Sequence, residues 1–221
     1  MPADRRFRVH DLLRLRNVDE LHWEETRPDW SSAALHRAPW VVVRRARARA
    51  ALLPVGVRGD VRHQRAAAWL PIDAVEQIVT PQILARRRTW HGRPRTKLLP
   101  ALLVLDAAAA ILEEQGHGDL WGPGGSVGFE LASGVPCVSA QSDLDLVLDA
   151  PEPIEVHDAA ALFTALERLS ARVDLLLETP LGAVALSEYA SGKRAVLLRT
   201  PSGPRLVADP WHASWAAGET A

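Results

Sequence analysis

The fold depends on the stretch Trp121-Gly-Pro-Gly-Gly-Ser-Val-Gly-Phe-Glu-Leu-Ala-Ser-Gly134, with Ser142-Asp-Leu-Asp-Leu-Val-Leu148 after it. The Gly-Gly-Ser turn predicts a short strand, and a second strand then carries Asp143 and Asp145. Because side chains at positions i and i+2 of a strand share a face, both carboxylates are expected to project together. The intervening leucines then face an apolar layer; they are Leu144, Leu146 and Leu148.

Two neighbouring carboxylates repel each other unless a positive charge lies between them. Oxygen ligands at this density suit a hard cation, and a pair of magnesium ions bridging a triphosphate would supply the charge. An isolated Asp-x-Asp pattern is more often a polar strand face or a turn. Here a helical segment and a glycine-serine turn precede the pattern, and apolar residues alternate with the aspartates, which favours a catalytic interpretation.

Gly-Ser followed by a strand with Asp-x-Asp resembles the signature of the nucleotidyltransferase superfamily typified by DNA polymerase beta. The interval between Ser126 and Asp143 is longer than usual for that superfamily, but it is similar to that of a narrower family. These are the holo-acyl-carrier-protein synthases of malonate decarboxylase, also called phosphoribosyl-dephospho-CoA transferases. Three further segments resemble the same family: His10-Asp-Leu-Leu13, Pro39-Trp-Val-Val-Val-Arg-Arg45, and Leu53-Pro-Val-Gly-Val-Arg-Gly59 with Gln64-Arg65 after it.

The resemblance implies an α/β (α+β) protein of two domains. A basic N-terminal α+β domain would span residues 1–90, and a polymerase-beta-like nucleotidyltransferase domain with a mixed sheet would span residues 98–221. The implied reaction transfers phosphoribosyl-dephospho-CoA from triphosphoribosyl-dephospho-CoA to a serine of the acyl carrier protein subunit of malonate decarboxylase, with release of pyrophosphate. Mg²⁺ is the implied cofactor.

The resemblance also implies the catalytic residues. Asp143 and Asp145 would hold the metal ions, and Asp174 on a later strand would complete the catalytic metal site. Glu178 shares a strand face with Asp174 and is the alternative for the third carboxylate.

Five further residues are expected to bind the substrate. The backbone of Gly125 and the hydroxyl of Ser126 would cradle the triphosphate, because tight turns present several N–H groups to an anion. Arg58 and Arg65 lie beside glycine-containing turns, and their planar guanidinium groups could grip phosphate oxygens. Lys193 would offset phosphate charge. For each basic residue, a solvated surface position is the alternative.

The composition predicts a globular protein with a real core. The chain has 221 residues, enough for one large or two small domains, and 48% of them are apolar. Cys137 is the only cysteine, so no intramolecular disulfide can form. The sequence shows no secretory segment and no apolar run of membrane-spanning length, which predicts a cytoplasmic protein without a membrane partner.

Charge is divided unevenly along the chain. The formal net charge is −1, yet residues 1–100 hold 20 Lys and Arg against 10 Asp and Glu, whereas residues 101–221 hold 6 against 17. A basic half beside an acidic half suits an enzyme that binds a triphosphate and a cation, and the basic half could steer an acidic carrier protein. A coding bias toward arginine is the alternative explanation.

Periodicity predicts the remaining elements. Strands are expected over residues 40–43, 54–59 and 172–178, helices over residues 98–115 and 156–172, helix plus loop over residues 17–37, helical spacing over residues 72–84, and hairpins from residue 186 onward. The basic segment 86–97 is expected to link the two halves and to contact an acidic protein or a phosphate tail.

Three alternative functions stay open. The chain could be a nucleotidyltransferase that uses an ordinary nucleoside triphosphate on another acceptor, or a nucleotide-binding regulator without catalysis. A nucleic-acid-binding protein would depend on the basic segment and its tryptophan, but no recognised nucleic-acid fold surrounds it, so nucleic acid is not an expected partner. The glycine patterns of P-loop and Rossmann nucleotide sites are absent.

Overall fold

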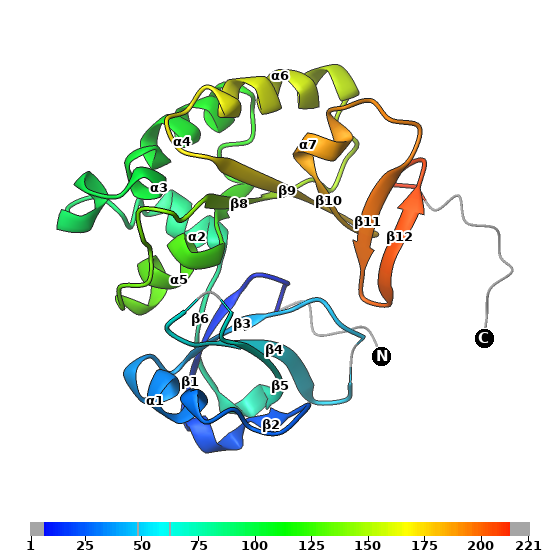
Figure 1. Cartoon of the computed structure of the whole chain (residues 1–221). Coiled ribbons are helices and arrows are strands. Elements are labelled where there is room, and N and C mark those ends of the chain that lie inside the picture. The colour runs from blue at the N-terminus through cyan, green and yellow to red at the C-terminus, as the bar shows by residue number, and fades with distance from the viewer. Residues whose placement is uncertain (1–6, 48, 62, 213–221) are drawn as a thin grey trace, which may run out of the picture.

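The computed structural model describes residues 7–47, 49–61 and 63–212 of the chain (Figure 1). Within them, the N-terminal part forms an antiparallel sheet of six strands. In sheet order these are β2 (His22–Trp23), β5 (Arg65–Pro71), β4 (Leu52–Arg58), β3 (Trp40–Val43), β1 (Leu12–Leu15) and β6 (Val75–Val79). Helix α1 (Trp30–Arg37) packs Leu35 into the core on one face of this sheet, beside Val41 and Val55.

The C-terminal part forms a second six-stranded sheet. In sheet order its strands are β12 (Gly203–Val207), β11 (Val196–Thr200), β10 (Gly182–Ala185), β9 (Val173–Thr179), β8 (Leu144–Asp149) and β7 (Trp121–Pro123). Helix α6 (Val156–Glu167) connects β8 to β9, and these two strands are parallel. The other pairs in this sheet are antiparallel. The α/β class with a mixed C-terminal sheet is therefore confirmed.

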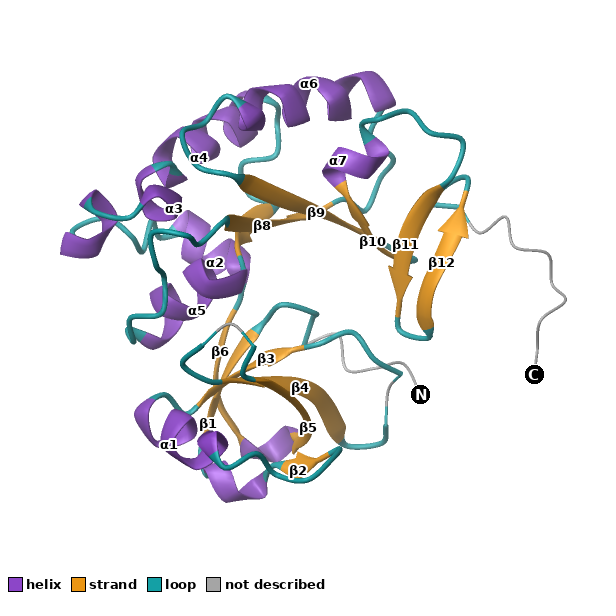
Figure 2. Cartoon of the chain, in the orientation of Figure 1, coloured by secondary structure: helices purple, strands orange, loops and turns teal. Residues whose placement is uncertain are grey.

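The centre of the second sheet is covered by helices on one face only (Figure 2). Leu144, Leu146 and Leu148 of β8 are at most 1% exposed and belong to a core shared with α6 and with α4 (Leu105–Glu114). This confirms the predicted apolar layer. Because side chains alternate along a strand, the acidic residues of β8 lie on the opposite face, toward the first sheet.

The Gly-Gly-Ser segment opens a helix, so the strand predicted there is wrong. Helix α5 runs over Gly125–Ser133, directly after β7. A Cβ atom at Gly128 would lie 2.5 Å from the carbonyl oxygen of Pro123, so glycine lets the helix pack against β7. Asp143 lies one residue before β8 and is not part of the strand.

The helical spacing predicted over residues 72–84 is wrong in its first half. Residues Val75–Val79 form β6, an edge strand paired with β1, and α2 (Pro81–Arg86) follows. Thr80 is the N-cap of α2, and its hydroxyl oxygen accepts a hydrogen bond from the Ile83 N–H at 3.2 Å.

Other predicted helices are confirmed with shorter bounds. Residues 98–115 contain the short helix α3 (Pro100–Leu103) and then α4, and residues 156–172 contain α6. Near the C-terminus, residues predicted to form part of a hairpin form a short helix instead, α7 (Leu186–Tyr189). No helix in the described ranges is long and apolar enough to span a bilayer.

The basic segment supports α5 and the loop that leads to Asp143. Glu130 of α5 is 4% exposed and accepts hydrogen bonds from Arg95 Nε and from the N–H groups of Cys137 and Val138, each at 2.8 Å. Burial alone would raise the pKa of Glu130, but these hydrogen bonds outweigh burial and lower it. The carboxylate therefore ties the basic segment to the loop before β8.

Two more residues of this segment have partners inside the protein. Trp90 is fully buried and donates its Nε1–H to Asp106 at 2.9 Å, and Arg93 donates to the carbonyl oxygen of Leu131 at 2.8 Å. These side chains and Arg95 therefore bind within the protein, and the contact of the segment with an acidic protein or a phosphate tail stays a prediction.

Candidate active site

Four carboxylates form two rows on the open face of the second sheet. In the parallel pairing of β8 and β9, Asp145 lies opposite Asp174, and Asp149 lies opposite Glu178. Residues four apart on a strand share a face, so both rows point toward the first sheet. The two rows have different surroundings.

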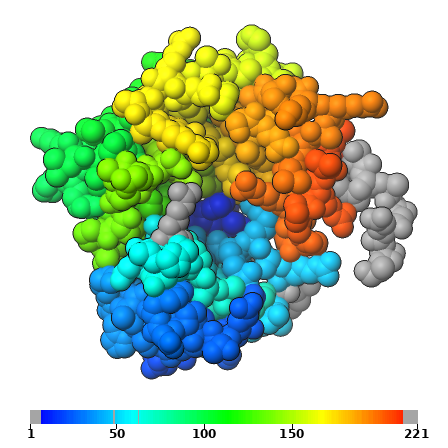
Figure 3. All heavy atoms as spheres, viewed as in Figure 1, coloured from blue at the N-terminus to red at the C-terminus, as the bar shows by residue number. Residues whose placement is uncertain are grey.

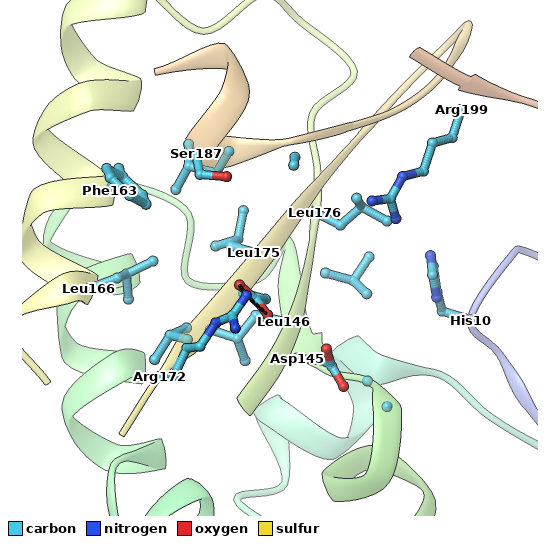
Figure 4. A pocket seen from close by; sticks show the side chains of 17 residues that line it. His10, Asp145, Leu146, Phe163, Leu166, Arg172, Leu175, Leu176, Ser187 and Arg199 are labelled. Carbon is cyan, nitrogen blue, oxygen red and sulfur yellow. Dashed lines mark hydrogen bonds and ion pairs between the residues drawn. The ribbon is translucent and has the colours of Figure 1, made fainter. Parts of the chain in front are cut away.

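The first row borders a cavity of about 480 Å³, here called the acidic cavity. Figure 4 shows Asp145 with His10, Arg172 and Arg199 around the same opening. The backbone at Gly125 completes its wall, and a Cβ atom there would lie 1.8 Å from Asp145 Oδ2. The Asp145 carboxylate thus lies directly against the start of α5, where only glycine leaves room.

The three predicted metal carboxylates act on one guanidinium group. Arg172 is ion-paired with Asp174 at 3.1 Å. Its hydrogen bond to Asp174, together with the negative charges of Asp174, Asp143 and Asp145, raises the pKa of Arg172. Among the described residues, no group of three His, Cys, Asp or Glu side chains is placed to hold a metal ion. In this structure Asp174 is therefore paired with an arginine.

The second row joins the two parts of the chain. Asp149 accepts from Arg8 Nη1 at 2.6 Å, while Glu178 contacts His10 Nε2 at 3.0 Å and Arg45 Nη2 at 2.5 and 2.6 Å. Burial would raise the pKa of Glu178, but the bonds from His10 and Arg45 lower it. Burial, assisted by the charge of Glu178, raises the pKa of Asp149. Glu178, the alternative third carboxylate, is thus engaged by the N-terminal part.

Asp11 is a buried carboxylate behind this row. It is 1% exposed, its side chain accepts the Arg8 N–H at 2.8 Å, and burial raises its pKa to about 6. Because this pKa is above the unfolded value of 3.8, the stability linked to the protonated group is complete below pH 4 and is lost as pH rises through 6.

We therefore expect Asp11→Asn to raise the free energy of unfolding at pH 7.5 by up to about 3 kcal/mol, because the amide carries no charge to bury. At pH 4 the gain should disappear. Urea denaturation at both pH values measures the difference, with the exposed Asp73→Asn as the matched control. An equal gain at both pH values would contradict the charge explanation.

A second cavity, also of about 480 Å³, lies between the first sheet and α5 and is here called the apolar cavity. Gly124, Gly125 and His10 line both cavities. Figure 3 shows the molecule hollowed between its N-terminal part, blue to cyan, and its C-terminal part, yellow to orange.

The structure brings some predicted substrate residues to these cavities and leaves others outside. Gly125 lines both cavities, and Arg58 and Arg65 line the apolar cavity. Ser126 lies in the first turn of α5 but is not among the lining residues of either. Lys193 is exposed in the turn before β11 and lines neither cavity.

Three residues of the acidic cavity were not predicted from the sequence as site residues. Arg172 stands two residues before Asp174, so strand alternation could have placed both on one face. Arg199 lies on β11, three strands away from β8, and only the sheet order brings it near. His10, named above only as part of a segment that resembles the family, adopts a left-handed backbone conformation (φ 75°) and reaches both cavities.

Comparison with known proteins shows the family of the chain. The model for the phosphoribosyl-dephospho-CoA transferase MdcG N-terminal domain matches residues 8–81, and the model for its C-terminal domain matches residues 92–210. A protein of Azotobacter vinelandii named phosphoribosyl-dephospho-CoA transferase is 45% identical over 205 residues, which cover 92% of this chain and 93% of the relative.

Two further relatives carry the same name. The protein from Pseudomonas aeruginosa is 42% identical over 92% of this chain and 93% of its own length. The protein from Klebsiella pneumoniae strain 342 is 38% identical, with 93% and 96% covered. No solved structure matches the chain. The chain is a transferase enzyme and belongs to the phosphoribosyl-dephospho-CoA transferase family.

Proposed function

We propose that this enzyme transfers phosphoribosyl-dephospho-CoA from triphosphoribosyl-dephospho-CoA to a serine of the malonate decarboxylase acyl carrier protein, in the cytoplasm, with release of pyrophosphate. The observation that carries the proposal is the placement of Asp145 against Gly125 at the start of α5, with Asp174 opposite it on β9. The family of the chain supports the identity of the transferred group.

The acidic cavity has the groups that a polyphosphate needs. The N-terminus of α5 begins at Gly125, and helix N-termini favour anions through their unpaired N–H groups and dipole. Arg172 and Arg199 line the same cavity, and guanidinium groups pair well with phosphate oxygens. Glycine at positions 124 and 125 lets the phosphates approach the backbone closely.

We propose Mg²⁺ as the cofactor, held by Asp143, Asp145 and Asp174. Carboxylate oxygens are the donors that this hard cation prefers, and the negative charges of all three, which raise the pKa of Arg172, support a local demand for positive charge. When bound, Mg²⁺ would neutralise charge on the triphosphate and on the leaving pyrophosphate. Asp174 would then exchange its guanidinium partner for the cation.

In the proposed reaction, the carrier serine oxygen forms a bond to the α-phosphorus, and the bond from that phosphorus to the pyrophosphate oxygen breaks. The serine proton passes to the carboxylate of Asp174. Arg172 and Arg199 hold the phosphates in line and stabilise the negative charge that moves onto pyrophosphate. The protein thus contributes mainly positioning and charge neutralisation.

Incubation with Mg²⁺, triphosphoribosyl-dephospho-CoA and the apo acyl carrier subunit tests this function. We expect the intact mass of the carrier to rise by one phosphoribosyl-dephospho-CoA group, with one pyrophosphate released per carrier. Asp143→Ala should abolish both signals, because it removes a cation ligand. Folded wild-type enzyme that leaves the carrier mass unchanged would refute the assignment, and ordinary nucleoside triphosphates would then be screened as donors.

A further inference from the structure

The floor of the apolar cavity is a row of four residues across four strands. Leu12 pairs with Val42, Val42 with Gly56, and Gly56 with Ala67, so their side chains share one face of the first sheet. All four line the cavity, and Phe129 of α5 lines it from the other part of the chain. The two small residues, Gly56 and Ala67, leave a flat apolar surface.

Positive charge flanks this floor. Arg58 and Arg65 are directly opposite each other on β4 and β5, two residues along each strand from the pair Gly56 and Ala67 and on the same face. Like charges directly opposite each other destabilise a sheet, so an anionic ligand would be favoured between them. The Arg58 guanidinium also lies 5.9 Å from the centre of the Phe129 ring, which keeps it at the edge of the cavity.

The apolar and acidic cavities meet at the start of α5. Gly124, Gly125 and His10 line both, and at the two glycines no side chain separates the cavities. A molecule with a polyphosphate at one end and an uncharged ring at the other could therefore occupy both cavities at once.

We propose that the apolar cavity binds the adenosine 5′-diphosphate portion of the substrate, an inference that rests on the proposed function. The adenine ring lies on the row that includes Gly56 and Ala67, and the diphosphate lies at Arg58 and Arg65. The added ribose crosses the Gly124–Gly125 backbone and carries the triphosphate into the acidic cavity.

Shape and connectivity favour adenosine over the pantetheine arm. A planar ring gains most from a flat floor of small residues with an aromatic side chain nearby, whereas a flexible chain loses more conformational entropy on binding. In phosphoribosyl-dephospho-CoA the added ribose is attached to the adenosine. Adenosine is thus the part closest to the reacting phosphate, and the cavity adjoining the acidic cavity is its natural position.

Filling the floor tests the proposal. Isothermal titration of the full chain with dephospho-CoA, ADP and pantetheine compares the wild type with Ala67→Leu. We expect Ala67→Leu to weaken dephospho-CoA and ADP binding at least about tenfold, because the added side chain occupies the ring position. Ala107→Leu adds the same volume on the exposed face of α4 and should change neither affinity.

A second variant keeps the test independent of folding at position 67. Arg58→Ala should weaken ADP about tenfold but adenosine less than about twofold, because the guanidinium contacts only the diphosphate. Unchanged affinities in a folded Ala67→Leu variant, no binding of ADP to the wild type, or binding of pantetheine but not ADP would each overturn the proposal.

The transfer assay separates this inference from the proposed function. If dephospho-CoA binding is lost in Ala67→Leu but the wild type never modifies the carrier, the adenosine site stands and the proposed reaction fails. If the wild type modifies the carrier and Ala67→Leu keeps the same KM, the reaction stands and the adenosine site fails.

Discussion

Asp145→Asn is expected to reduce the transfer rate at least about 10³-fold while leaving the fold intact. The amide has the shape of the carboxylate but not its charge. Asp145 faces Asp174 across β8 and β9 and lies against the start of α5, so it is the carboxylate nearest the proposed phosphate position. Single-turnover rates from the carrier's intact mass, with circular dichroism as a check on folding, measure the effect.

Asp149→Asn is the matched control, because Asp149 is on the same face of the same strand, one row away. Its partner is Arg8 of the N-terminal part, at 2.6 Å, and it does not line the acidic cavity. We expect this variant to keep most of the activity and to lose some stability. Equal losses of activity in both variants would show that the two carboxylate rows do not differ in function. The assignment of the active site to the row of Asp145 would then be wrong.

The strand that carries Asp145 could be predicted because local pattern and tertiary structure agree there. Leu144, Leu146 and Leu148 recur at every second position and are buried against helices, while Asp145 and Asp149 lie on the other face of the strand. The same pattern predicted β9 and the shared face of Asp174 and Glu178. It could not show that Arg45 and His10 already bind Glu178, because those contacts span more than 130 residues.

Helix α5 could not be predicted because its sequence has little intrinsic helix propensity. Two of its nine residues are glycine, which favours a turn or an irregular segment. Its contacts override this preference: Gly128 permits close packing on Pro123, and Glu130 is held by Arg95. For the edge strand β6 the prediction was a helix, because Val75, Ile78 and Val79 have helical spacing. Pairing with β1 makes them a strand instead.

Gly125→Ala is expected to lower the transfer rate at least about 100-fold, although it adds a single methyl group. Gly125 has a φ of +52°, and a Cβ atom there would lie 1.8 Å from Asp145 Oδ2 and 2.6 Å from its Cγ. The Asp145 side chain must therefore move away from the start of α5. The left-handed backbone conformation should also cost about 1–2 kcal/mol of unfolding free energy.

Gly134→Ala separates these two effects. Gly134 is at the other end of α5 and also has a left-handed φ, of +74°, but among the described residues a Cβ atom there would meet nothing within 4 Å beyond its chain neighbours and its own helix. We expect both variants to lose similar unfolding free energy in urea, but only Gly125→Ala to lose activity. If both lose activity equally, stability alone explains the result. If neither does, the contact between Asp145 and the Gly125 backbone has no role in catalysis, because displacing the carboxylate would have had no effect on transfer.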